Sequence, residues 1–386
     1  MNIKEKDSLY IANTYARFPI ALKSGSGSLA YDDDGNEYID MATGIAVNTF
    51  GYSDTEWVRA VTEQLNLLQH TSNLYYSEPC VKLAEMLCEK TGMKKVFFSN
   101  SGAEANECAI KVARKYAAAK KGEDCYKIIT LKNSFHGRTI TTLAATGQDV
   151  FHKDFLPLTD GFIHCEANNC EELRELVKKN NVAAIMFEAV QGEGGVLPLT
   201  KEFVETIFDL AREYDILTIA DEVQTGNGRT GKLYAFMNYG VKPDIFSTAK
   251  GLGGGLPLGA TVLGSKVENV LGNGDHGSTF GGNPIACAGA VNILSRIDEE
   301  LLNGVCEKSN YIKEKLTAAK GVKSVSGLGF MLGIETEKDA SEVIAECRKN
   351  GVLVIKAKNK VRLLPALNIP EELLIKAVDV IIDACK

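Results

Sequence analysis

Two charged residues of this chain stand where buried strands are expected to end. Asp221 closes the run ILTIAD, and Lys250 follows DIFSTA and precedes the glycine-rich stretch GLGGG. A carboxylate in such a position can hold a protonated nitrogen, and an amine there can bond covalently to an aldehyde or ketone. The ordinary alternatives are a capping Asp and a solvated Lys, although a buried lysine without a use is costly. The two residues together indicate a ligand site.

Groups suited to an anion occur at two further places. KVFFSNSGAEANE passes from a strand through Ser101, Gly102 and Ala103 into a helix, whose first N–H groups are free to bind a phosphate. HGSTFGGNP offers Ser278 and Thr279 among glycines. A plain helix cap would also explain the first stretch, and a turn would explain the second. Both remain candidates for phosphate binding.

Two more strand ends carry aromatic and charged side chains. KIITLKNSFHGRT places Phe135, His136 and Arg138 after one strand, and MFEAVQGEGG places Glu188 and Glu193 after another. Core packing would also account for Phe135, and an ordinary surface charge for Arg138. Because ligands of α/β proteins bind at the carboxyl ends of parallel strands, we expect these side chains to meet at one edge of a sheet.

The stretch DEVQTGNGRTGK contains the glycine spacing of two nucleotide-binding motifs. Gly226, Gly228 and Gly231 fit GxGxxG, and Lys232 completes most of a P-loop. The P-loop fails because Leu233 stands where Ser or Thr must bind Mg²⁺. The dinucleotide motif should open a helix, but KLYAFMNYGVKP leaves little room for one before the next strand. A nucleotide-binding protein is therefore the weaker alternative.

Short apolar runs that alternate with helical stretches must position these residues. From about residue 95 the runs are KVFFSN, KIITL, AAIMFEAV, ILTIADEV, DIFSTA and GATVLG, with amphipathic segments such as KEFVETIFDLAREY between several of them. The alternation predicts an α/β fold with a mainly parallel sheet covered by helices on both faces. FMLGIE, VLVIK and VRLLP, lying among helices, predict a smaller α+β domain, and SLAYDDDGNEYIDMATG predicts a hairpin with a polar turn.

Composition narrows the class of protein. The 386 residues exceed what one core usually organises, so two subdomains are expected. A net charge of −7 argues against a nucleic-acid partner, and no apolar run reaches the length of a membrane helix. MNIKEKDSLY lacks the apolar segment of a signal peptide, and ten cysteines without a CxxC pair are expected to be reduced, so we expect a cytoplasmic protein. Five histidines without an HxxxH pair predict no metal site.

One ligand suits all of these candidate groups. Pyridoxal 5′-phosphate (PLP) has a phosphate, a flat ring that can stack on Phe135, a ring nitrogen that binds a carboxylate, and an aldehyde that reacts with lysine. NSGAEANE, FHGRT, DEVQTGNGRTG, AKGLGGGLPLGA and STFGGNP resemble the class-III aminotransferases, which are PLP enzymes of fold type I. The resemblance extends from TYARFPIALKSGSG to VRLLPALNI, and within the family it is strongest to members that act on acetylornithine.

The resemblance implies a role for each candidate. Lys250 would bind the cofactor covalently and shuttle a proton, and Asp221 would pair with the ring nitrogen. The other cofactor contacts would come from Ser101, Gly102, Ala103, Phe135, His136, Glu222, Val223, Gln224 and Thr279. Thr279 would come from a neighbouring subunit, so a homodimer with shared sites is implied. The expected domains are a large PLP-binding domain over residues 46–283 and a small domain formed by residues 1–45 and 284–386.

The implied reaction transfers the terminal amino group of N²-acetyl-L-ornithine to 2-oxoglutarate, giving N-acetyl-L-glutamate 5-semialdehyde and L-glutamate in arginine biosynthesis. Arg138 would bind the distant carboxylate in both half-reactions, and Arg362 only the α-carboxylate of glutamate or 2-oxoglutarate. Glu193 would pair with Arg362 when the donor lacks that carboxylate, and Glu188 and Ser278 would complete the substrate contacts. The alternatives within the family are ornithine, succinylornithine, N-acetyl-lysine and 4-aminobutyrate aminotransferases.

Overall fold

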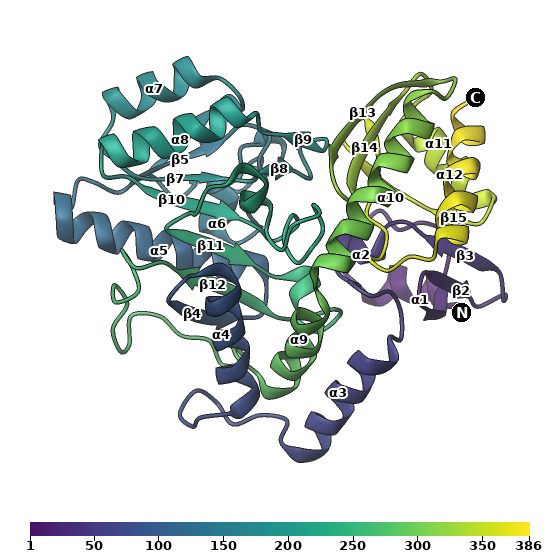
Figure 1. Cartoon of the computed structure of the whole chain (residues 1–386), viewed down its shortest axis with the longest axis horizontal. Coiled ribbons are helices and arrows are strands. Elements are labelled where there is room, and N and C mark those ends of the chain that lie inside the picture. Colours follow the sequence, from purple (N-terminus) through teal and green to yellow (C-terminus); the bar gives the residue numbers. More distant parts are fainter.

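The chain folds into two lobes, as the computed structural model of residues 1–386 shows (Figure 1). The larger lobe is built on a seven-stranded sheet, and the smaller lobe contains both ends of the chain. None of the helices is both long and apolar enough to cross a membrane.

The large sheet is mainly parallel, as predicted. Its strands in spatial order are β4 (Lys95–Ser99), β12 (Gly259–Leu263), β11 (Ile245–Thr248), β10 (Leu217–Asp221), β7 (Val182–Phe187), β5 (Lys127–Leu131) and β6 (Phe162–Cys165). The five strands from β11 to β6 are parallel, whereas β12 runs antiparallel to both of its neighbours. A short connection without an α-helix joins β11 to β12, and a parallel arrangement would need a longer crossover.

Both faces of this sheet are buried. Successive residues of one strand enter different apolar clusters: Ile128 packs on the face covered by α5, and Ile129 packs on the face covered by α8. Continuous apolar runs are typical of strands covered on both sides. The helices of this lobe are α3 (Thr55–Leu67), α4 (Glu78–Thr91), α5 (Gly102–Lys121), α6 (Ile140–Ala145), α7 (Cys170–Lys179), α8 (Lys201–Glu213) and α9 (Pro284–Arg296). Single 3₁₀ turns occur at η1 (Asp149–Phe151), η2 (Ala235–Tyr239) and η3 (Lys250–Leu252).

The smaller lobe has an antiparallel sheet in the order β13 (Val322–Leu328), β14 (Met331–Thr336), β17 (Lys360–Leu363) and β16 (Ile355–Ala357). It packs with α10 (Glu299–Thr317), α11 (Ala340–Lys349) and α12 (Glu371–Cys385) around one apolar cluster. The strands expected in FMLGIE, VLVIK and VRLLP are therefore confirmed. A small hairpin of the large lobe, β8 (Val190–Gln191) with β9 (Leu197–Pro198), lies against this lobe through β13.

The N-terminal segment joins the smaller lobe. It contains α1 (Ile3–Tyr10), β1 (Leu22–Ser26), β2 (Leu29–Asp32), β3 (Glu37–Asp40) and α2 (Thr43–Ala46). The predicted hairpin is present as β2 and β3, and β3 also pairs in parallel with β15 (Val352–Leu353). The division at residues 45 and 283 remains a prediction. Helix α9, which follows the second boundary, packs in the core of the large sheet, so a division by apolar cores would fall after α9.

Candidate active site

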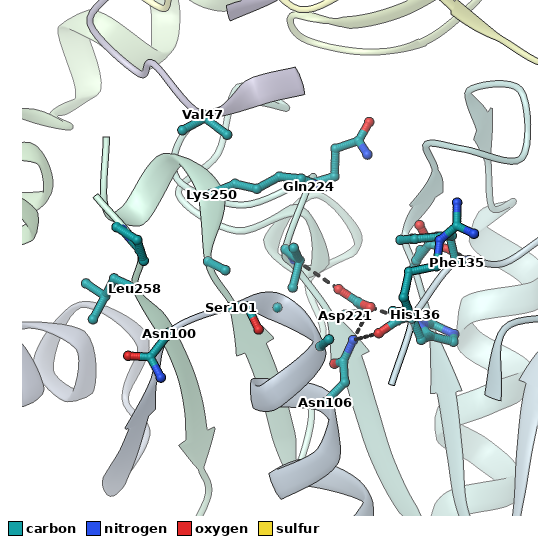
Figure 2. A pocket seen from close by; sticks show the side chains of 18 of the residues that line it. Val47, Asn100, Ser101, Asn106, Phe135, His136, Asp221, Gln224, Lys250 and Leu258 are labelled. Atoms are coloured by element: carbon teal, nitrogen blue, oxygen red, sulfur yellow. Dashed lines mark hydrogen bonds and ion pairs between the residues drawn. The ribbon is translucent and has the colours of Figure 1, made fainter. Parts of the chain in front are cut away.

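A cavity of about 430 Å³ opens at the carboxyl edge of the large sheet, between the two lobes (Figure 2). The connections that follow β4, β5, β7, β10 and β11 all contribute to its wall. A mainly parallel sheet brings its strand ends together at this edge, which explains why residues far apart in sequence meet here. The predicted site residues in the wall are Ser101, Gly102, Ala103, Phe135, His136, Arg138, Glu188, Asp221, Val223, Gln224 and Lys250.

Asp221 is held in place by three hydrogen bonds. Its Oδ2 accepts one from Asn106 Nδ2 and faces His136 Nδ1, both at 2.8 Å, and its Oδ1 accepts one from the Val223 amide at 3.0 Å. Figure 2 marks these bonds around the labelled carboxylate. Asn106 also donates to the carbonyl oxygen of His136 at 2.8 Å, so the three side chains form one network. The carboxylate is therefore fixed in direction at the bottom of the cavity.

Lys250 begins the 3₁₀ turn η3 directly after β11 and has φ of +47°. Its side chain extends into the cavity and its amine makes no hydrogen bond or ion pair within the protein. Loss of water around the side chain lowers the pKa of Lys250, while the nearby carboxylates of Glu193 and Asp221 act in the opposite direction. A lowered pKa increases the fraction of neutral amine, which is the nucleophilic form.

The start of α5 forms one wall. Ser101 caps the helix, and its Oγ accepts a hydrogen bond of 3.2 Å from the Glu104 amide. The amides of Gly102 and Ala103, in the first turn, have no partner within a helix and lie at the cavity. A Cβ on Gly102 would approach Val223 Cγ1 to 2.6 Å, so only glycine allows this close packing. The helix start thus offers an anion site beside Asp221.

Phe135 and Arg138 both line the cavity. The Phe135 amide donates to Glu188 Oε1 at 2.9 Å, which fixes the loop after β5. Arg138 is exposed, lies 4.1 Å from the ring centre of Phe151 and 5.4 Å from that of Phe135, and forms no ion pair. Its guanidinium is therefore available to a ligand carboxylate. Burial raises the pKa of Glu188 to about 7, with a nearby carboxylate contributing and His136 opposing.

Glu193 and Arg362 form an ion pair behind Gln224. Arg362 Nη1 donates to Glu193 Oε1 at 2.6 Å and to Gln224 Oε1 at 2.9 Å, and Nη2 donates to Glu193 Oε2 at 3.4 Å. Burial alone would raise the pKa of Glu193, but the Arg362 guanidinium outweighs it and the pKa lies below its usual value. Neither residue lines the cavity directly, and Gln224 connects the pair to it.

Three further predicted residues lie outside the cavity. The side chain of Glu222 lies in the core, where its buried carboxylate accepts hydrogen bonds from Thr225 Oγ1 and from the Ala235 and Phe236 amides, so a contact with the cofactor stays a prediction. Burial raises its pKa to about 7 despite these bonds. Ser278 Oγ accepts a hydrogen bond of 3.2 Å from Asn100 Nδ2, and Asn100 in turn lines the cavity. Thr279 is exposed in a separate hollow beside Tyr76 and does not reach the cavity of its own chain.

The glycines of TGNGRTG serve packing between the lobes. Gly228 and Gly231 have φ of +89° and +82°, and side chains there would collide with Leu367 and Cys306 of the smaller lobe. Arg229 donates to the carbonyl oxygens of Phe330 and Pro365 in that lobe. No α-helix follows, since only the turn η2 precedes β11. The spacing therefore reflects close packing, and only the preceding Val223 and Gln224 reach the cavity.

Asn106 is the functional candidate that the sequence interpretation missed. It lies one helical turn after Gly102, on the buried face of α5, where its neighbours Ala105, Cys108 and Ala109 are small and apolar. A buried amide on such a face requires a polar partner. The spacing of four residues from the predicted anion site would have placed it on the same side of the helix.

The cavity fits PLP in size and in chemistry. Its volume lies in the usual range for small-ligand sites, and it brings together an amine, an enclosed carboxylate and a helix start. Gly102 and Ala103 bring the first amides of α5 to the wall of the cavity, and Phe135 offers an aromatic face. Bound PLP would be held by Lys250 at its aldehyde carbon, by Asp221 at its ring nitrogen and by the first amides of α5 at its phosphate.

Comparison with known proteins agrees with this geometry. The family model of class-III aminotransferases matches residues 10–385. The acetylornithine aminotransferase of Haemophilus ducreyi is 49% identical over 98% of this chain and 97% of its own, and the succinylornithine transaminase of Citrobacter koseri is 42% identical over 99% and 97%. An ornithine aminotransferase from Toxoplasma gondii, with PLP at partial occupancy at its active site, superposes with a TM-score of 0.94 at 32% identity, covering 99% and 93% of the two chains. The chain therefore belongs to the class-III aminotransferases and is an aminotransferase with PLP as its cofactor.

Proposed function

We propose that this aminotransferase transfers the terminal amino group of N²-acetyl-L-ornithine to 2-oxoglutarate, forming N-acetyl-L-glutamate 5-semialdehyde and L-glutamate in arginine biosynthesis. The observation that carries the proposal is the pairing of Arg362 with Glu193 beside an unpaired Arg138. Such a site can present either one or two free guanidinium groups. It can therefore accept a donor with one carboxylate far from the reacting amine, and then a dicarboxylate.

Arg138 would bind the carboxylate that both substrates carry away from the reacting carbon. Arg362 would bind the second carboxylate of 2-oxoglutarate or glutamate after Glu193 has left it. With acetylornithine, which has no carboxylate at the reacting carbon, Glu193 would stay on Arg362 and neutralise it. Arginine suits both positions because its planar group binds a carboxylate through two hydrogen bonds.

The chemistry at the reacting carbon needs a movable proton and an electron-poor ring. When bound, PLP supplies the ring, which takes up the electrons left at the substrate carbon. Lys250 Nζ would remove the proton from that carbon and deliver it to the carbon of PLP that carries the aldehyde. Asp221 would keep the ring nitrogen protonated, and its bonds to Asn106 and His136 hold it in place for that purpose.

The relatives that act on succinylornithine and ornithine define the competing donors. The test is single-turnover kcat/KM for the PLP form with N²-acetyl-L-ornithine, N²-succinyl-L-ornithine, L-ornithine, N-acetyl-L-lysine and 4-aminobutyrate. We expect the highest value with N²-acetyl-L-ornithine. A higher value with any other donor would overturn the assignment of substrate and leave the aminotransferase family unaffected.

We also propose that the enzyme works as a cytoplasmic homodimer. All ten cysteines are free, which fits a reducing compartment. Thr279 would reach the phosphate site of the partner subunit, and the residues near it expose large apolar side chains that a second copy would cover. These are Leu74, Tyr75, Tyr76 and Phe280, with exposed fractions of 86, 73, 99 and 59%.

Subunit mixing tests the shared site. In a hybrid of a Lys250→Ala chain and a Thr279→Ala chain, one site would carry both changes and the other neither. Activity should therefore partly recover when the two inactive proteins are mixed under conditions that exchange subunits. No recovery despite demonstrated exchange would contradict a contribution of Thr279 to the partner's site.

A further inference from the structure

The loop that carries Glu193 is anchored in the smaller lobe at its far end. Residues 192–196 join β8 to β9, and Val196 has φ of +54° although it is β-branched and fully buried. A β-branched residue in the left-handed region is strained and persists only where its surroundings hold it. The side chain of Val196 lies in an apolar cluster with Met331 and Leu364, which belong to the smaller lobe.

A chain of two hydrogen bonds fixes the backbone at the same point. Ser326 Oγ donates to the carbonyl oxygen of Val196 at 2.7 Å, and Lys360 Nζ donates to Ser326 Oγ at 2.8 Å. Lys360 is only 8% exposed, and its ammonium forms no ion pair and no other hydrogen bond. Burial lowers the pKa of Lys360, with Glu335 opposing the shift. A buried cation with one neutral acceptor is costly, so its place in this contact needs an explanation.

Two side chains on one face of β17 act on the loop that carries Glu193. Lys360 and Arg362 are two residues apart in the strand, so their side chains point to the same side. Lys360 acts through Ser326 on the backbone of Val196, and Arg362 binds the side chain of Glu193. Gly333 leaves the space for this arrangement, because a Cβ there would lie 2.7 Å from Val196 Cβ and 3.2 Å from Lys360 Cδ.

We propose that Ser326 and Lys360 are positioning residues that set the balance of the site between its two substrate types. They fix the backbone after Glu193, so that its side chain alone swings away from Arg362 and returns to the same place. Without this anchor the loop shifts, Glu193 pairs less with Arg362, and the unpaired guanidinium disfavours the terminal-amine donor. The inference rests on the proposed function of Glu193 as the alternative partner of Arg362.

The test is single-turnover kcat/KM of Ser326→Ala and Lys360→Met for each half-reaction of the holoenzyme. Loss of one hydrogen bond predicts a fall of about 3- to 10-fold with the amine donor. The half-reaction with 2-oxoglutarate should stay unchanged or become faster. Ser341→Ala is the matched control, since Ser341 Oγ accepts a similar bond of 2.6 Å from Lys356 in the same lobe, away from the loop. This control should change neither half-reaction.

A double variant separates positioning from a general loss of structure. Because Ser326 acts through Glu193, adding Ser326→Ala to Glu193→Ala should leave the ratio of the two half-reactions as it is in Glu193→Ala alone. If Glu193→Ala itself leaves the wild-type ratio unchanged, the proposed gate is wrong. If Glu193→Ala shifts the ratio but Ser326→Ala and Lys360→Met behave like Ser341→Ala, or slow both half-reactions equally, the anchor is wrong.

Discussion

The two charged ends of the site are built in different ways. At one end, Asp221 accepts hydrogen bonds from a helix side chain, a loop amide and a histidine, and its side chain is 4% exposed. At the other end, the Arg362 side chain is 2% exposed but is bound by a carboxylate that is itself 30% exposed and stands on a glycine-rich loop. The first charge is enclosed by buried groups, whereas the second is paired with a partly exposed carboxylate on a loop.

This contrast matches what the two half-reactions would require under the proposed roles of Asp221, Arg362 and Glu193. The ring nitrogen of PLP would need the same carboxylate with either substrate, so Asp221 can be held rigidly in both half-reactions. A receptor for the α-carboxylate is needed with one substrate and is harmful with the other, because an unpaired guanidinium in a buried site is costly. A side chain on a loop can supply and withdraw the neutralising charge, which a helix or strand residue in a packed core cannot do.

The proposed role of Lys250 belongs to both half-reactions, so its loss should have the largest effect. Lys250→Ala removes the proposed nucleophile and proton carrier, and both half-reactions should fall by at least about 1000-fold. The measurement is steady-state turnover together with single-turnover rates for the two forms of the enzyme. Multiple turnover at the wild-type rate would show that another group does this work.

Asp221→Asn tests the rigid end. It keeps the shape of the side chain and removes the charge, so both half-reactions should slow by a similar factor of about 10- to 150-fold. The fold should remain, which a thermal unfolding curve would check. An Asn variant as active as the wild type, or one impaired with only one substrate, would contradict the role of Asp221 at the ring nitrogen.

Arg362→Ala tests the switchable end. The half-reaction of 2-oxoglutarate or glutamate should lose about 10- to 150-fold in kcat/KM, since a charged two-bond contact is removed. The half-reaction of acetylornithine should change much less. The two rates are measured separately on the pyridoxamine and PLP forms, and Arg138→Ala, which should impair both, is the comparison. An equal loss of kcat/KM in both half-reactions of Arg362→Ala would show that Arg362 does not distinguish the two substrate types.

Glu193→Ala should have the smallest effect and the opposite direction. Arg362 would then have no neutralising partner, so the acetylornithine half-reaction should fall by about 3- to 10-fold while the dicarboxylate half-reaction holds or improves. Glu193→Gln is a useful second variant, because it keeps the hydrogen bond of the side chain without the charge. A loss confined to the dicarboxylate would show that Glu193 does not act as the gate.

The rigid end is easier to predict from the sequence than the switchable one. Strand ends are visible as apolar runs, and a parallel sheet brings them together, so the sequence alone places Asp221, Lys250 and the start of α5 at one edge. The direction of β12 is not visible in the sequence, because it depends on the short connection after Lys250 rather than on strand composition. Strand β6 escapes prediction, since FIHC is short and contains a histidine.

Tertiary packing decides where the side chains of the remaining residues lie. The family resemblance implies Glu222 as a cofactor contact, but adjacent residues in an extended segment point to opposite sides, and its carboxylate enters the core. The pair of Glu193 with Arg362 is expected only through family resemblance, since the two residues are far apart in sequence and no local pattern joins them. The hydrogen bond between Lys360 and Ser326 has no sequence signal, because the same two residue types occur as an exposed lysine and an ordinary serine in a strand.

The pairing of β3 with β15 has a consequence for synthesis on the ribosome. Strand β3 is made near the start of the chain, and its parallel partner appears only about 300 residues later. All seven strands of the large sheet are complete before that point, at Leu263, when the smaller lobe still lacks five of its eight strands, β13 to β17. The nascent hairpin therefore waits with an open strand edge, which is a hazard for association with other chains. A pulse of protease on stalled chains should find residues 22–40 sensitive until residue 353 has emerged, and early protection would show that another segment covers the edge first.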